Sequence, residues 1–255
     1  MADYDNRVLR GQASTAGAID AGLRSYMLRV YNYMFAGLAL TGVAAYGAFL
    51  AAVTTDPAAA VTRMHNGVML TSFGAMLFGP LMWVLLIASL GLVLFLSFRI
   101  NKMSVTAARA SFLTYAAVVG LTFASLFVVY TQTSIAQVFF ITAATFGTMS
   151  LWGYTTKSDL TGFGSFLFMG LIGLVIAMVV NMFLQSNAMA FVISCAGVLI
   201  FTGLTAYDTQ VIKSNYAASD DSDTAGRKAI FGALRLYLDF INLFLMLLRL
   251  MGNRR

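Results

Sequence analysis

Charged residues are scarce in this sequence, and their scarcity decides the class of protein. Only 10% of the 255 residues are charged, 60% are hydrophobic, and glutamate does not occur at all. An average soluble chain has about 25% charged residues. The composition therefore excludes a soluble domain, a disordered chain and a coiled coil. We expect an all-α integral membrane protein that crosses the bilayer several times.

Cysteine and histidine each occur once, as Cys195 and His65. This excludes a disulfide within the chain and any metal site built from a Cys or His cluster. The sequence also has no phosphate-binding loop, dinucleotide fingerprint or zinc-ligand spacing. We therefore expect no cofactor and no enzymatic activity. In a membrane protein the net charge of +6 reports topology rather than nucleic-acid binding.

Long hydrophobic runs predict seven membrane-spanning helices, since a bilayer core needs about 20 apolar residues per helix. The expected spans are 30–53, 80–98, 110–130, 134–154, 162–184, 188–212 and 229–250. The connections are short, so the spans form one domain over 30–252. Residues 1–29 are polar and lack an apolar core, so we expect a cytosolic tail and not a signal peptide. Residues 253–255 form a basic C-terminal end.

The uncharged stretch 66–98 is too long for a single span. Pro80 divides it, and proline is well tolerated at the start of a helix. We interpret 66–79 as an interfacial or loop segment that precedes the second span. One long tilted helix is the alternative.

Basic residues predict the orientation of the bundle. With a cytosolic N-terminus, twelve of the sixteen Lys and Arg residues fall on the cytosolic side and four fall outside, which agrees with the positive-inside rule. The basic C-terminal end would then lie outside, which fits that rule poorly. A re-entrant last segment is the alternative that returns this end to the cytosol.

Glycines recur in the first and fifth spans. We interpret them as sites of close helix packing rather than as hinges, because small residues let helix backbones approach. These glycines are Gly37, Gly42, Gly47, Gly162, Gly164, Gly170 and Gly173.

Two carboxylates lie within predicted spans, Asp208 in the sixth and Asp239 in the seventh. Charges inside a membrane are costly and mark functional sites. The two spans are consecutive and antiparallel, which places both aspartates in the cytosolic half of the bundle. A close carboxylate pair in a poorly solvated site responds to protons. When ionised it also offers oxygen ligands to Ca²⁺, in a weak and transient site.

A structural role for these aspartates is the alternative. Arg235 and Asn242 share a helix face with Asp239, so Arg235 could neutralise that aspartate within its own helix. Lys213 could reach Asp208 in the same way. Arg99 ends the second span on the cytosolic side, either as a counter-ion for the pair or as an ordinary headgroup anchor.

Two motifs carry a resemblance to a known family. Residues 236–244 spell LYLDFINLF, and residues 207–210 spell YDTQ. With seven spans and a semi-hydrophobic last helix, these motifs resemble the Bax inhibitor-1 family, in particular its bacterial, YccA-like members. The likeness covers roughly residues 20–252.

The resemblance implies a fold in which the last helix is central and surrounded by the other six. It also implies a pH-sensitive calcium leak through the membrane, with Asp208 and Asp239 as the sensor. Arg99 matches the family's latch partner by position, and Arg235, Asn242 and Tyr207 are supporting candidates. Some bacterial relatives instead regulate a membrane-anchored AAA protease, which is the alternative function.

An intramembrane aspartyl protease is the competing enzyme class. Its second motif is Gly-x-Gly-Asp, whereas Leu236, Tyr237 and Leu238 precede Asp239 here. A serine protease lacks a base, because no histidine lies in a span. We therefore expect a multi-pass protein of the bacterial inner membrane, with lipid and calcium ions as partners and the AAA protease as a further possible one.

Overall fold

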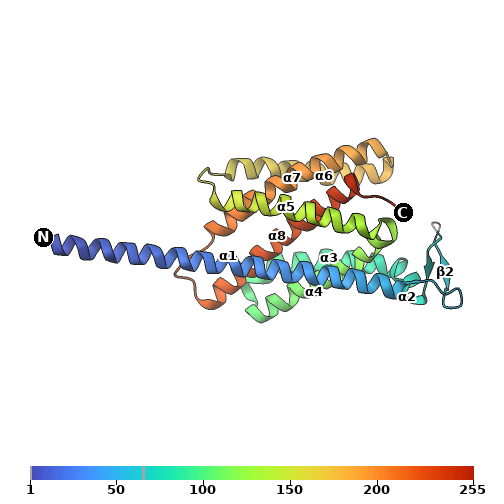
Figure 1. Ribbon diagram of the computed structural model, residues 1–255, viewed down its shortest axis with the longest axis horizontal. Helices are drawn as coiled ribbons and strands as arrows, with labels where there is room; N and C mark the ends of the chain where they lie inside the picture. Colours follow the sequence, from blue (N-terminus) through green and yellow to red (C-terminus); the bar gives the residue numbers. More distant parts are fainter. Residues whose placement is uncertain (1, 65–66) are drawn as a thin grey trace.

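The computed structural model describes residues 2–64 and 67–255, and for residues 2–19 only the helical backbone. His65, the single histidine, is outside the described residues. Figure 1 shows a bundle of long helices with a small sheet at one end. The helices are α1 (Ala2–Ala52), α2 (Ser72–Leu77), α3 (Pro80–Arg99), α4 (Val105–Val129), α5 (Gln132–Thr155), α6 (Thr161–Leu184), α7 (Asn187–Ser214) and α8 (Ser222–Met251), with a 3₁₀ turn η1 (Ile100–Lys102).

Seven of the described helices are long and apolar enough to cross a membrane. They match the seven predicted spans, except that α1 ends one residue before Val53 and α4 one residue before Tyr130, so the fold class is confirmed. Several helices extend past the predicted limits of the spans. The prediction rests on apolar residues, whereas a helix can continue into polar turns beyond them. Residues 2–29, expected as a polar tail, form the first part of helix α1. The part of α1 that is apolar enough to cross a membrane begins at Asp20.

The segment between the first two spans forms a small sheet and a short helix. Strands β1 (Val53–Thr54) and β2 (Thr62–Arg63) both pair antiparallel with β3 (Met69–Leu70). Helix α2 then ends before Gly79, and α3 begins at Pro80. One long helix over this stretch is therefore wrong, since Pro80 has no N–H to continue an α2 ladder. The predicted break at Pro80 is confirmed.

Helix α8 is the most buried span: 67% of its most apolar stretch is buried inside the molecule. Its main neighbours are α1, α4, α5 and α7, whereas α3 packs mainly on α4 and α6 mainly on α7. The prediction that all six other spans surround α8 is therefore not confirmed. Four of them make up most of its surroundings. The reason is visible in composition: α3 and α6 have the highest hydropathy and are 11% buried, so they suit positions that face lipid.

The C-terminus lies at the end of the bundle opposite the start of α1 (Figure 1). Helix α8 is unbroken over 30 residues. The chain after it bridges the α4–α5 connection, where the N–H of Arg255 donates to the carbonyl of Val129 and Arg254 pairs with Tyr130. The re-entrant alternative is therefore wrong, because α8 has no interior break at which the chain could turn back.

Candidate functional site

Asp208 and Asp239 lie against the same cavity. It has a volume of about 380 Å³ and is formed between α6, α7 and α8. Asp208 is 7% exposed and Asp239 is 5% exposed, so both carboxylates are withdrawn from solvent. The structure thus brings together the two aspartates that the sequence singled out.

The spacing on α8 explains why one face of this helix is polar. Arg235, Asp239 and Asn242 follow one another at intervals of four and three residues, which places them in a stripe on one side of a helix. All three line the cavity together with Leu238. The opposite α7 wall contributes Asp208, and the stripe therefore faces the carboxylate of the preceding span.

Arg235 binds Asp208 with both ends of its guanidinium fork. Its Nη2 lies 2.7 Å from Oδ1 of Asp208, and its Nε lies 3.1 Å from Oδ2. A bidentate pair of this kind is charge-assisted and fixes the relative position of its two partners. The bond therefore ties α7 to α8 across the cavity.

Asp239 has no comparable partner. Its Oδ2 atom is buried and accepts no hydrogen bond among the described residues. Asn242, one turn further along, donates from Nδ2 to the carbonyl of Leu238 at 2.8 Å. A buried oxygen without a donor is energetically costly, so this atom marks the position where a proton or a cation gains most by binding.

The remaining lining is apolar. Helix α6 contributes four large side chains, and Phe201, Leu204 and Tyr207 come from α7; the α6 residues are Phe168, Leu171, Val175 and Met178. The ring of Tyr207 packs on Gly164, where a Cβ would overlap it. Apolar walls keep the dielectric constant low and strengthen every charge interaction within the cavity.

The structure does not pair Arg99 with either aspartate. Asp208 pairs with Arg235, and Arg99 is exposed at the end of α3, with no ion pair to a described residue. The reason is the position of α3, which packs on α4 outside the helices that carry the aspartates. Arg235, one of the supporting candidates, is the residue that forms an ion pair with Asp208.

Neither of the two alternative pairings is formed as a direct hydrogen bond. Arg235 does not hydrogen-bond to Asp239 in its own helix, because its fork is occupied by Asp208. Lys213 does not turn back to Asp208; its Nζ donates to the carbonyl of Tyr154 at 2.7 Å and lies 5.0 Å from the centre of that ring.

Sequence reasoning missed a polar contact on the other side of α8. The hydroxyls of Thr41 and Tyr237 are 2.7 Å apart, and Thr41 also donates to the carbonyl of Ala116. The contact joins α1, α4 and α8 where the side chains are fully enclosed. Only the tyrosine inside the LYLDFINLF motif signalled it in the sequence.

The pair of carboxylates can exchange protons and attract a cation, but it does not form a closed metal cage. No group of three or more acidic, His or Cys side chains gathers anywhere in the described part of the chain. Ca²⁺ takes six to eight oxygen ligands in a tight site. Two carboxylates thus suit transient contact with a cation.

Comparison with known proteins assigns the chain to a family. The family model described as inhibitor of apoptosis-promoting Bax1 matches residues 23–255. The chain belongs to the Bax inhibitor-1 family. It is 48% identical over 238 residues to the inner membrane protein YbhL of Escherichia coli K12, covering 92% of this chain and 94% of that protein. It is 43% identical to the uncharacterized protein RP147 of Rickettsia prowazekii over the full length of both chains.

Family membership confirms the resemblance drawn from the two motifs. In this Bax inhibitor-1 family protein, residues 236–244 supply Asp239 and residues 207–210 supply Asp208, so both motifs meet at the cavity. The chain is a multi-pass membrane protein of this family.

Proposed function

We propose that this protein is a pH-sensitive calcium leak pathway of the bacterial inner membrane. The observation that carries the proposal is one cavity lined by two buried carboxylates, of which Asp208 is paired with Arg235 and Asp239 has an unpartnered Oδ2. Its elements are Asp208 and Asp239 as proton sensor and cation contact, and Arg235 as counter-ion. The name of the Escherichia coli relative supports the inner-membrane location.

The first step of the proposal concerns the cation. A hard divalent ion prefers oxygen ligands, and the cavity presents the carboxylates of Asp208 and Asp239 and the amide of Asn242. The unpartnered Oδ2 of Asp239 is free to meet an ion without breaking a bond. Few ligands mean weak binding, and weak binding lets an ion leave again, as conduction requires.

The second step concerns the closed state. Beyond Asp239, α8 is packed with enclosed apolar side chains, among them Leu243, Met246 and Leu248. Apolar constrictions exclude ions and act as gates. A cation in the cavity thus needs a movement of α8 relative to its neighbours before it can pass.

The third step connects protons to that movement. The Arg235–Asp208 pair holds α8 against α7, and its strength depends on the charge of the carboxylate. Protonation of Asp208 removes one charge of the pair and weakens the tie. Acid therefore favours separation of the two helices and opening of the pathway.

Calcium flux into liposomes that contain the purified protein tests the proposal across pH 5 to 8. We expect flux to rise as pH falls. Asp208→Asn and Asp239→Asn should each flatten this pH dependence, and the double variant should add little to either, because residues of one site act as a unit. Asp223→Asn, at an exposed position in the first turn of α8, is the matched control.

Two results would overturn the proposal. One is flux that is absent or independent of pH in the parent protein. The other is strictly additive effects of the two aspartate variants, which would make the carboxylates independent structural groups. In the first case the regulator hypothesis takes precedence, and recovery of a membrane-anchored AAA protease with the tagged chain tests it.

A further inference from the structure

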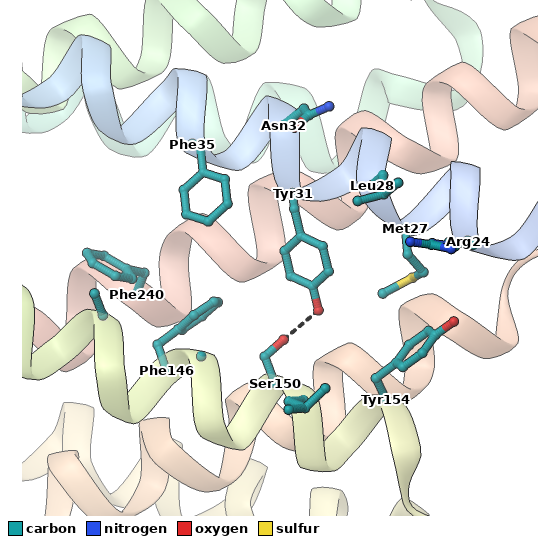
Figure 2. A pocket seen from close by; sticks show the side chains of 13 residues that line it. Arg24, Met27, Leu28, Tyr31, Asn32, Phe35, Phe146, Ser150, Tyr154 and Phe240 are labelled. Atoms are coloured by element: carbon teal, nitrogen blue, oxygen red, sulfur yellow. Dashed lines mark hydrogen bonds between the residues drawn. The ribbon is translucent and has the colours of Figure 1, made fainter.

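A second hollow, of about 620 Å³, lies between α1 and α5 on the other side of the bundle core (Figure 2). Helix α1 packs on α4 and α8, and α5 packs on α7 and α8, so the two helices flank a groove. Phe240 of α8 also lines it. Figure 2 shows side chains from both flanking helices directed into this space.

Most of the groove is lined by apolar side chains, and it is open on the lateral surface of the bundle. Leu28 and Phe35 of α1 and Leu151 of α5 line it and are 53%, 59% and 64% exposed, in that order. Gly147 adds depth, because a Cβ at this position would meet no atom within 4 Å. In a bilayer these side chains face hydrocarbon, so the groove can take up an acyl chain without loss of apolar contact.

One end of the groove is basic. Arg24 lines it from α1, is exposed, and has no ion pair or hydrogen-bond partner for its guanidinium among residues 20–64 and 67–255. Asp20, one turn earlier on the same helix, forms no ion pair with it. Tyr154 closes the same end from α5. Arg24 is therefore the cationic side chain that lines the groove where its apolar floor ends.

A hydrogen bond crosses the groove next to this end. The hydroxyl of Tyr31 is 2.6 Å from that of Ser150, which is 2.9 Å from the hydroxyl of Thr209 on α7. Figure 2 shows the first of these bonds spanning from α1 to α5. The bond fixes the width of the groove at the boundary between its apolar floor and its basic end.

We propose that this groove is a binding site for one anionic phospholipid of the surrounding membrane. The acyl chain lies along Phe35, Phe146 and Phe240, and the phosphate group lies at Arg24. Charge complementarity selects the occupant, because basic pockets between membrane helices bind anionic headgroups. A zwitterionic lipid would bring its ammonium group close to the Arg24 guanidinium and bind more weakly.

Native mass spectrometry of the purified full-length protein, loaded with equal amounts of phosphatidylglycerol and phosphatidylcholine of the same acyl chains, tests the charge requirement. We expect the parent protein to retain phosphatidylglycerol in preference. Arg24→Gln should reduce this preference about fivefold, the effect expected for one cation at an anionic membrane surface. Arg29→Gln is the matched control, since Arg29 is exposed on the same helix and does not line the groove.

A second pair of variants tests the groove itself. Gly147→Leu fills the open space and should abolish retention of the bound lipid. Gly173→Leu is the control, because Gly173 on α6 is equally open but lies outside the groove. Equal effects of Arg24→Gln and Arg29→Gln would show that only general surface charge attracts lipid. Unchanged retention by Gly147→Leu would show that lipid binds elsewhere; either result overturns the site.

Discussion

Arg235 lies one helical turn before Asp239 on α8, yet both of its hydrogen bonds go to Asp208 on α7. A pair within one helix would add nothing to the contact between α7 and α8. The observed pair instead adds a charge-dependent bond to the packing of these two helices. Asp239 consequently remains without a donor for Oδ2, and the two aspartates of the site have different environments.

The first prediction concerns the counter-ion. Arg235→Gln should raise calcium flux at pH 7.5 and reduce the response to acid, because the tie between α7 and α8 is already lost. The open population should rise about 5- to 150-fold, as for a coupling free energy of about 1–3 kcal/mol. Flux into oriented liposomes measures this. Arg235→Lys should fall between, since lysine keeps the charge without the fork.

Arg99→Gln is the control for that experiment, because Arg99 is exposed and unpaired among the described residues. Its flux-versus-pH curve should match the parent curve. A leak caused by Arg99→Gln and not by Arg235→Gln would restore Arg99 as the latch partner and contradict the structure.

The second prediction separates the two aspartates by stability. Asp208→Asn loses charge-assisted hydrogen bonds and should lower the free energy of unfolding by about 1.5–3 kcal/mol. Asp239→Asn removes no hydrogen bond to Oδ2 and should change it by less than about 1 kcal/mol. Unfolding in detergent micelles at pH 7.5 compares the two. Equal losses would mean that Asp239 has a partner of its own.

The third prediction concerns helix contact near the site. A Cβ at Gly153 of α5 would overlap the carbonyl of Ala206 on α7, whereas a Cβ at Gly162 of α6 meets no atom within 4 Å. Gly153→Ala should destabilise the protein by about 1–3 kcal/mol, as overpacking does. Gly162→Ala should have no destabilising effect. Thermal unfolding of both variants in the same detergent decides it, and similar melting temperatures would refute the contact.

The glycines also show what the sequence could not predict. Gly37, Gly164 and Gly170 lie at helix contacts as expected, but a Cβ at the other four would meet no atom within 4 Å; these are Gly42, Gly47, Gly162 and Gly173. A glycine in a span looks the same whether it faces a helix or lipid. Only the helix arrangement, which no local pattern encodes, distinguishes the two cases.

The residues of the site could be predicted from the sequence, but the ion pair between them could not. Asp208 and Asp239 were identifiable because charge within a span is rare, and the break at Pro80 because proline has one preferred place in a helix. The partner of Arg235 was not identifiable, since helical spacing favours Asp239 and the rotation of α7 against α8 favours Asp208. Arg99 was assigned by order along the chain, and that order says nothing about α3 lying outside the site helices.

The fourth prediction is a pH effect outside the spans. Asp221 caps α8, and the hydrogen bonds from Thr224 hold the pKa of its carboxyl below the usual value. A lowered pKa means that the cap stabilises the fold above the ordinary carboxyl pKa of about 3.9 and is lost as pH falls through the native value. Asp221→Ala should therefore lower the melting temperature at pH 7 and have progressively less effect in acid.

Asp221→Asn is the control for the cap. Asparagine caps helices as well as aspartate does but carries no titratable group. Its melting temperature at pH 7 should stay close to that of the parent protein. A constant difference between Asp221→Ala and the parent from pH 7 down to pH 3 would show that the ionised carboxylate is not the stabilising group.

The last prediction concerns orientation, on which the direction of the proposed acid response depends. Ser104 directly precedes α4 and Ser158 lies between α5 and α6, whereas Ala58 lies between β1 and β2; all three are exposed. The start of α4 and the α5–α6 connection are at the N-terminal end of the bundle, and the small sheet is at the opposite end (Figure 1). In a Cys195→Ala background, a membrane-impermeant maleimide applied to intact spheroplasts should label Ala58→Cys. It should label Ser104→Cys and Ser158→Cys only after the membrane is opened. The physical reason is the excess of basic residues at the first end, which the positive-inside rule retains in the cytosol. Labelling of Ser104→Cys or Ser158→Cys in sealed spheroplasts would invert the bundle and place the aspartate cavity nearer the exterior. The proton sensor would then respond to external rather than cytosolic acid.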